Sequence, residues 1–114
     1  MKIRDLIDKI QGKLVCGEGK LDNEVDYAFA SDLMSDVLTV ERSNLLLITG
    51  LANLQAIRTA EMSDISFVIF ARNKKVTPDM KVIAEENNMV LIESSASVFR
   101  ISGELFLAGI KPLF

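Results

Sequence analysis

The sequence predicts a single α/β domain, residues 1–114, in which helices cover a mainly parallel sheet. The apolar run at 45–48 and the continuous β-rich run at 65–71 have the pattern of strands that are buried on both faces, which is typical of parallel sheets. A third run, MVLIE at 89–93, follows at a similar spacing. Segments of helical length and amphipathic pattern alternate with these runs, and this alternation implies crossover connections above and below a sheet.

An amphipathic helix opens the chain, because apolar side chains recur there at helical spacing: Ile3, Leu6, Ile7 and Ile10. Residues 13–17 have the pattern of a short strand, and the Gly-rich, charged residues 17–24 have that of a turn or loop. Apolar and other residues then alternate over 25–30, which predicts a half-buried strand.

Residues of N-cap type precede each later helix, and they mark where we expect those helices to begin. They are Ser31 and Asp32, then Asn53, then Thr77 followed by Pro78, and finally Ser94 or Ser95. The last helix is expected to run to about Ala108, with an inner stripe of Val98, Ile101, Leu105 and Ala108.

Composition narrows the classes of function. The formal net charge is −3, which argues against a nucleic-acid binder, since such proteins carry a basic surplus. The N-terminal segment is interrupted by charges and does not resemble a signal peptide, and no apolar run is long enough to cross a bilayer. With a single cysteine, Cys16, the chain forms no internal disulfide. We therefore expect a cytoplasmic protein that contacts neither nucleic acid nor membrane.

Groups that usually carry catalysis are scarce. The chain contains no histidine, which removes the common serine and cysteine triads and most zinc sites. Cys16 lies in an apolar segment and is expected to be part of the core. The GEGK string at 17–20 lacks the earlier glycine of a phosphate-binding loop, and Leu21 follows where Ser or Thr would be needed. Asp32 and Asp36 are four residues apart, a spacing more typical of a solvated helix face. We expect no enzyme activity, no catalytic residue, no metal and no cofactor.

The Thr49-Gly50 step ends the first buried strand, and ligands of open parallel sheets bind beyond such strand ends. Backbone amides and a hydroxyl at this corner are suited to holding an anion or a partner's carbonyl group. The alternative is that Gly50 only turns the chain and Asn53 only caps a helix, and the local pattern favours it. The candidate ligand- or partner-binding residues are Ser31, Asp32, Thr49, Gly50, Asn53, Gln55 and Arg58.

The last helix has a second apolar line besides its inner stripe. A helix that is apolar on two sides is either enclosed within one domain or buried by a second chain. In so short a chain we expect the second arrangement, a homodimer. Its predicted interface residues are Phe99, Phe106, Ile110 and Phe114.

Several segments taken together resemble a DRTGG domain over most of the chain, about residues 25–110. They read FASDLMSDVL, LLLITGLANLQAIRTAEMSDISFVIF, IAEENNMVLIES and FRISGELFLAGI. The Asp-Arg-Thr-Gly-Gly string that names the family is not present, and its nearest echo is Arg58-Thr59. The family is similar to the N-terminal domain of HPr kinase/phosphorylase and, more distantly, to that of Mur ligases, which implies an α/β fold with a mainly parallel sheet.

The resemblance also bears on function. DRTGG domains accompany CBS domains, pyrophosphatases and phosphotransacetylases without carrying the catalytic groups, and stand-alone members are associated with iron hydrogenase gene clusters. It therefore implies a non-catalytic regulatory or oligomerisation module that acts through a protein partner, whose identity the sequence does not indicate. The alternative is a sensor of a nucleotide or another phosphate-bearing metabolite at the Thr49-Gly50 corner.

Overall fold

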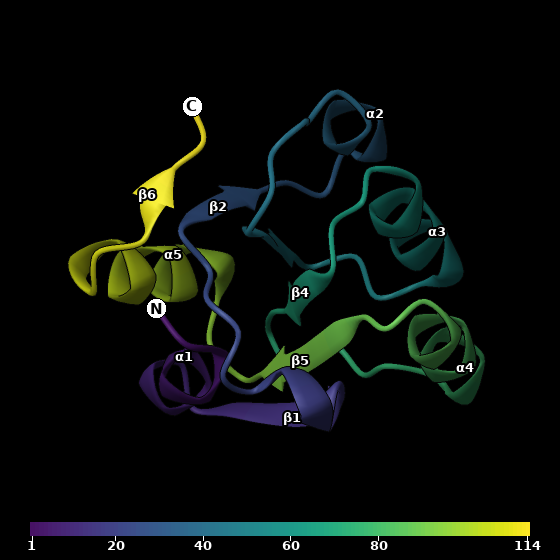
Figure 1. Ribbon diagram of the computed structural model, residues 1–114, viewed down its shortest axis with the longest axis horizontal. Coiled ribbons are helices and arrows are strands. Elements are labelled where there is room, and N and C mark those ends of the chain that lie inside the picture. The colour runs from purple at the N-terminus through teal and green to yellow at the C-terminus, as the bar shows by residue number, and fades with distance from the viewer.

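One six-stranded sheet, with strand order β1-β5-β4-β3-β2-β6, forms the centre of the computed structural model, which describes residues 1–114 (Figure 1). Strands β2 to β5 are parallel to one another, and β6 is parallel to β2. Strand β1 is antiparallel to β5 at the opposite edge. The strands are β1 (Gly12–Cys16), β2 (Tyr27–Ala30), β3 (Leu45–Thr49), β4 (Phe67–Phe70), β5 (Val90–Ser94) and β6 (Lys111–Pro112). The predicted α/β domain with a mainly parallel sheet is confirmed.

Helices lie on both faces of the sheet, three on one and two on the other (Figure 1). One layer holds α2 (Met34–Val37), α3 (Leu54–Met62) and α4 (Pro78–Glu86). The other holds α1 (Ile3–Lys9) and α5 (Val98–Leu107). A short 3-10 turn, η1 (Glu18–Lys20), follows β1, so the GEGK string is a turn as expected. None of these helices combines the length and the apolar character that crossing a bilayer requires.

The three central strands β3, β4 and β5 are buried at every position, which explains why apolar residues run on consecutive positions in them, with polar residues only at the ends of β3 and β5. In β3, Leu45 and Leu47 point toward the α2–α4 layer, whereas Leu46 and Ile48 point toward α1 and α5. Each such side chain stabilises the fold by roughly 1.5–3 kcal/mol through burial. Two apolar clusters, one on each side of the sheet, thus hold the layers together.

Two helix starts are as expected. The Asn53 side chain accepts a hydrogen bond from the Ala56 backbone N–H at 2.9 Å and caps α3. Thr77 caps α4 in the same way through the Met80 N–H at 3.3 Å, with Pro78 as the first helical residue. Each cap satisfies an amide that a helix N-terminus would otherwise leave unpaired.

Two other starts differ from the prediction. Helix α2 begins after Leu33 without a side-chain cap, because Ser31 and Asp32 lie before it in the loop. Helix α5 is capped by Ser97, whose hydroxyl accepts from the Arg100 N–H at 3.1 Å. Ser94 belongs instead to β5, and its hydroxyl donates to the Ile10 carbonyl at 2.8 Å. Asp32 and Ser94 are both of a type that caps helices, but each makes hydrogen bonds to residues far along the chain instead.

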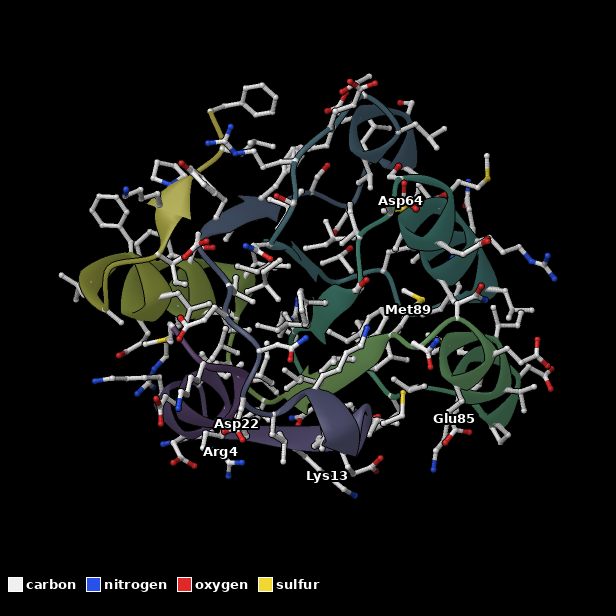
Figure 2. All side chains as sticks on the ribbon, in the orientation of Figure 1. Arg4, Lys13, Asp22, Asp64, Glu85 and Met89 are labelled. Atoms are coloured by element: carbon white, nitrogen blue, oxygen red, sulfur yellow. The ribbon has the colours of Figure 1, made fainter.

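The first helix is tied to the turn that follows β1. The Arg4 Nε lies 2.7 Å from the Asp22 Oδ1, and both side chains are exposed (Figure 2). A hydrogen bond and the charge of Arg4 hold the pKa of Asp22 below its usual value. Exposed pairs of this kind contribute little to stability, so packing of Ile3 and Leu6 is what anchors α1.

Candidate functional site

The Thr49-Gly50 corner lies at the carboxyl end of β3 and is organised by one carboxylate. Asp32, in the loop between β2 and α2, accepts two hydrogen bonds through Oδ1. The Thr49 hydroxyl donates at 2.9 Å and the Gly50 N–H at 2.7 Å. The Thr49 oxygen in turn accepts from the Leu51 N–H at 3.1 Å. The corner is therefore a closed hydrogen-bond network that joins two neighbouring strands beyond their ends.

Glycine at position 50 is favoured by the closeness of Asp32 and not by an unusual backbone conformation. Its φ lies outside the left-handed region that favours glycine. A Cβ at this position would lie 3.3 Å from the Asp32 Oδ2, closer than a side chain is normally accommodated. The absence of a side chain lets the carboxylate approach the backbone.

This geometry bears on the predicted anion site. The Thr49 hydroxyl and the Gly50 N–H, which were expected to hold a ligand, already donate to Asp32. An approaching phosphate would have to displace that carboxylate and would be repelled by its charge. As it stands, the corner is suited to fixing the chain and not to receiving an anion.

The remaining candidate residues of the corner have separate roles. The Ser31 hydroxyl accepts from the Leu33 N–H at 3.0 Å, a local turn. Asn53 caps α3. Gln55 and Arg58 are exposed on α3. The structure thus joins Asp32, Thr49 and Gly50 in one network and gives the other four residues local or solvent-exposed positions.

Sequence reasoning missed Glu93, a buried carboxylate near the end of β5 that is 8% exposed. Its Oε2 accepts from the Val76 N–H at 2.8 Å, and its Oε1 lies 3.6 Å from the Lys75 Nζ. In the register of the sheet Thr49 faces Phe70, which faces Glu93, so the two polar positions are two strands apart, roughly 10 Å. The sequence feature that could have revealed Glu93 is an acidic residue at the end of an apolar run. Through Val76 and Lys75, Glu93 holds the loop before α4.

No group of three or more His, Cys, Asp or Glu side chains is placed to hold a metal ion. Cys16 is fully buried in the core, and its thiol lies 3.5 Å from the Met89 carbonyl oxygen (Met89 is labelled in Figure 2). Burial raises the pKa of this thiol, so at neutral pH it stays protonated and is a poor nucleophile. The expectation that Cys16 belongs to the core is confirmed.

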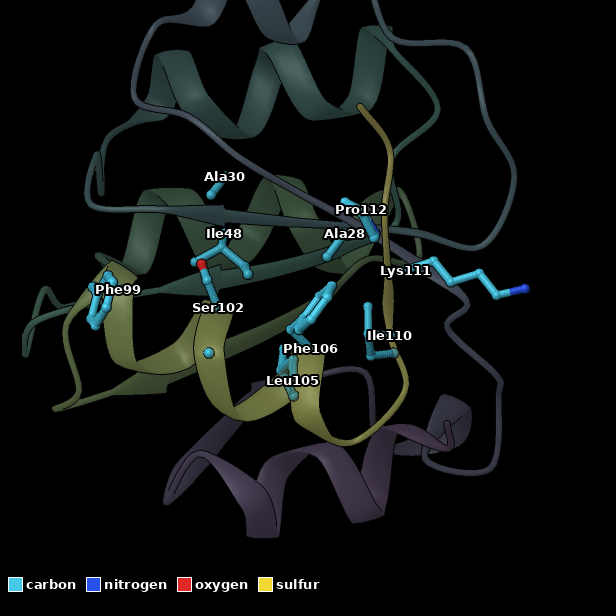
Figure 3. Close-up of a pocket in the computed structure, with 11 residues that line it drawn as sticks. Ala28, Ala30, Ile48, Phe99, Ser102, Leu105, Phe106, Ile110, Lys111 and Pro112 are labelled. Carbon is cyan, nitrogen blue, oxygen red and sulfur yellow. The ribbon is translucent and has the colours of Figure 1, made fainter.

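A second candidate site is an apolar groove between α5 and the β2–β6 edge of the sheet (Figure 3). Its volume is about 370 Å³. Side chains of α5 form one wall, the sheet forms the floor, and the segment leading into β6 forms the other wall. The lining residues are Ala28, Ala30 and Ile48 of the sheet, Phe99, Ser102, Gly103, Leu105 and Phe106 of α5, and Ile110, Lys111 and Pro112.

The predicted interface residues fall into three environments. Phe99 and Phe106 are 89% and 65% exposed and flank the groove, and the exposed Leu107 extends this apolar surface. Ile110 is only 4% exposed, because it packs in the core between α5 and the sheet, which differs from the outward position that the sequence indicated. Phe114 is exposed but lies outside the groove, where its ring meets Phe29 edge-on at 5.6 Å between centroids.

Neither a protein-family model nor a curated protein matches the sequence. A solved structure does match. It holds the CBS and DRTGG domains of the regulatory region of Clostridium perfringens pyrophosphatase, complexed with its activator, diadenosine tetraphosphate. The TM-score is 0.70 and the sequence identity 10%, over 91% of this chain and 45% of that chain. The likeness is one of fold, and this chain spans less than half the length of that one. The fold likeness supports the expected DRTGG- or CBS-like domain, and it does not extend to the expected relationship with HPr kinase or Mur ligases.

Proposed function

We propose that this protein is a non-catalytic regulatory module that acts by protein association and forms a homodimer through its α5 surface. The α5 surface is defined as Phe99, Gly103, Phe106 and Leu107 together with the adjoining groove. The single observation that carries the proposal is the exposure of two phenylalanine rings beside an apolar groove of about 370 Å³. Contiguous apolar patches of this kind mark interaction sites.

The polar groups support the non-catalytic part of the proposal. Asp32 and Glu93, the carboxylates at the ends of β2 and β5, accept hydrogen bonds from the protein's own backbone. A general acid or base needs a proton-transfer partner within reach in the substrate, and both of these groups are occupied with structural donors. The buried Cys16 thiol is similarly committed to the core.

The regulatory part of the proposal draws on the fold likeness. The similar structure comes from the regulatory region of an enzyme and was determined with an activator bound. Fold alone does not determine function, so the argument depends on the α5 surface as the site that transmits the regulation. The same proposal includes an evolutionary relationship to DRTGG domains. Through them it extends to the N-terminal domains of HPr kinase and Mur ligases.

The test is the state of association of matched variants. Phe99→Ser combined with Phe106→Ser removes both exposed rings without touching a buried residue. Met62→Ser removes an exposed apolar side chain from α3, on the opposite helical layer, and is the control. Light scattering should give twice the 12.6 kDa chain mass for the wild type and the control, and a monomer for the double variant. A wild type that remains monomeric at 100 μM, or a double variant that still dimerises, would overturn the proposal.

A nucleotide sensor is the second candidate, favoured by the activator in the similar structure. Any phosphate site would have to lie away from the Thr49-Gly50 corner, or Asp32 would have to be displaced from it. A thermal-shift panel of mono- and dinucleotides, diadenosine tetraphosphate included, separates the candidates. A ligand at 100 times its dissociation constant stabilises the folded state by about 2.7 kcal/mol, an easily measured shift in Tm. The leading proposal predicts no shift, whereas a dose-dependent shift would establish the sensor.

A further inference from the structure

Gly103 occupies the outermost point of α5. It is two residues from each of the buried side chains Ile101 and Leu105. At 100° per residue, a position two residues from both lies on the opposite side of the helix. Phe99 and Phe106, four residues before and three after, are its neighbours on this side. The residue without a side chain therefore lies in a notch between two exposed rings.

Nothing within the chain requires a glycine at this position. Gly103 lies in the middle of a helix, and its φ is outside the left-handed region. A Cβ built there would meet no atom within 4 Å. Glycine in a helix interior is nonetheless less favourable than alanine. The chain thus carries a local destabilisation that its own packing does not explain, and close approach by an atom from outside the chain would explain it.

We propose that a second copy of this chain fills the notch, with the two α5 helices crossing at Gly103 on a two-fold axis. This inference rests on the proposed homodimer and specifies its geometry. A two-fold contact requires a surface that is complementary to itself. The α5 surface meets this requirement, because it presents protruding rings and a receiving groove on the same helix. Two helices approach closely where glycine removes the side chain, so the rings of each copy reach the groove of the other.

The spacing of the rings agrees with such a crossing. At 1.5 Å per residue, Phe99 lies about 6 Å before Gly103 along the helix axis, and Phe106 about 4.5 Å after it. The notch is therefore near the middle of the aromatic surface, as a two-fold axis requires. In an antiparallel pair each Phe99 lies toward the end of the partner helix that carries Phe106 and Leu107.

The area of this surface is consistent with a dimer. A phenylalanine buries roughly 150–250 Å², so Phe99 and Phe106 at their observed exposures offer roughly 230–390 Å² per copy. That is roughly a third to a half of the 800 Å² that each partner contributes to a standard interface. Leu107 and the groove walls extend the contact beyond the two rings.

Gly103→Ala tests the crossing, because we expect it to favour folding of the monomer and to weaken association of the dimer. In the monomer, measured by urea unfolding at high dilution, alanine should raise the folding equilibrium constant about two- to fivefold. In the dimer the added methyl group occupies the space of the partner helix, and the dissociation constant should rise about fivefold or more. Gly19→Ala is the matched control, since a Cβ there also meets no atom within 4 Å and Gly19 lies beside Asn88 and Met89, outside the α5 groove.

The outcomes separate this inference from the proposed function. Weaker association of Gly103→Ala with unchanged association of Gly19→Ala supports the crossing. Unchanged association of Gly103→Ala, in a protein whose dimer still depends on Phe99 and Phe106, overturns the crossing at Gly103 and leaves the dimer in place. A wild type that is monomeric at every concentration overturns both.

Discussion

At the scale of single residues, Asp32 shows how a surface carboxylate can determine the shape of a loop. Its Oδ1 satisfies the hydroxyl of Thr49, a fully buried residue, and the N–H of Gly50. No buried side-chain nitrogen or oxygen in the protein lacks a hydrogen-bond partner, and Asp32 is what makes this true at the corner. Glycine at position 50 is the counterpart of this arrangement, because a side chain there would crowd the carboxylate.

Replacing Asp32 with alanine should therefore destabilise the fold. The change leaves the hydroxyl of the buried Thr49 without its acceptor, and an unsatisfied buried donor costs about 1–3 kcal/mol, whereas the exposed Gly50 N–H can bond to water instead. Urea unfolding measures the free energy of unfolding, and Asp36→Ala is the control, since Asp36 is exposed and its carboxylate has no hydrogen-bond donor. Asp32→Asn keeps one oxygen acceptor, so its free energy of unfolding should lie between those of Asp32→Ala and Asp36→Ala. Equal stability of the Asp32 and Asp36 alanine variants would show that the network is dispensable.

At the scale of helices and strands, the sequence predicted the elements whose signals are local. Strands β3, β4 and β5 are buried on both faces, so their apolar runs identify them without knowledge of their neighbours. The caps of α3 and α4 were predicted for the same reason, because cap and helix are adjacent in the chain. Local chemistry was sufficient where local interactions decide the structure.

The elements that were mispredicted depend on distant partners. Asp32 was expected to cap α2, but Thr49 and Gly50, 17 and 18 residues away, engage it instead. Ser94 was expected to cap α5, but its hydroxyl donates to Ile10, 84 residues away. The antiparallel pairing of β1 and the short edge strand β6 likewise depend on strands far along the chain. A sequence pattern cannot show which of several competing acceptors a polar side chain will meet in the folded state.

The same reasoning explains the mixed outcome for the interface residues. The second apolar line of α5 is visible in the sequence, and Phe99 and Phe106 on it are exposed. Ile110 lies beyond the helix end, after Gly109 at φ +104, so helical spacing no longer gives its direction and it turns into the core. Gly103 was overlooked because a glycine has no side chain to contribute to an apolar stripe. The reason for a glycine there is visible only from the open space around it in the structure.

At the scale of the whole molecule, the two helical layers are unequal. Helices cover both faces of the sheet, three on one face and two on the other (Figure 1). The groove lies between α5 and the β2–β6 end of the sheet (Figure 3). A second copy docked on α5 would extend the smaller layer and bury the exposed rings. Regulation through such a surface needs no reactive group, since partner binding changes the apparent stability and population of the associated state by mass action.

The most direct measurement is a dilution series of two-dimensional ¹⁵N–¹H NMR spectra of the wild-type chain, from the millimolar to the low micromolar range. It reports association and the surface involved in the same experiment. We expect concentration-dependent shifts at residues 99–107, at the groove residues of β2 and at Ile110 and Lys111, with α3 and α4 unchanged. Spectra that do not change with concentration, or shifts centred on α3 and α4, would contradict association through α5.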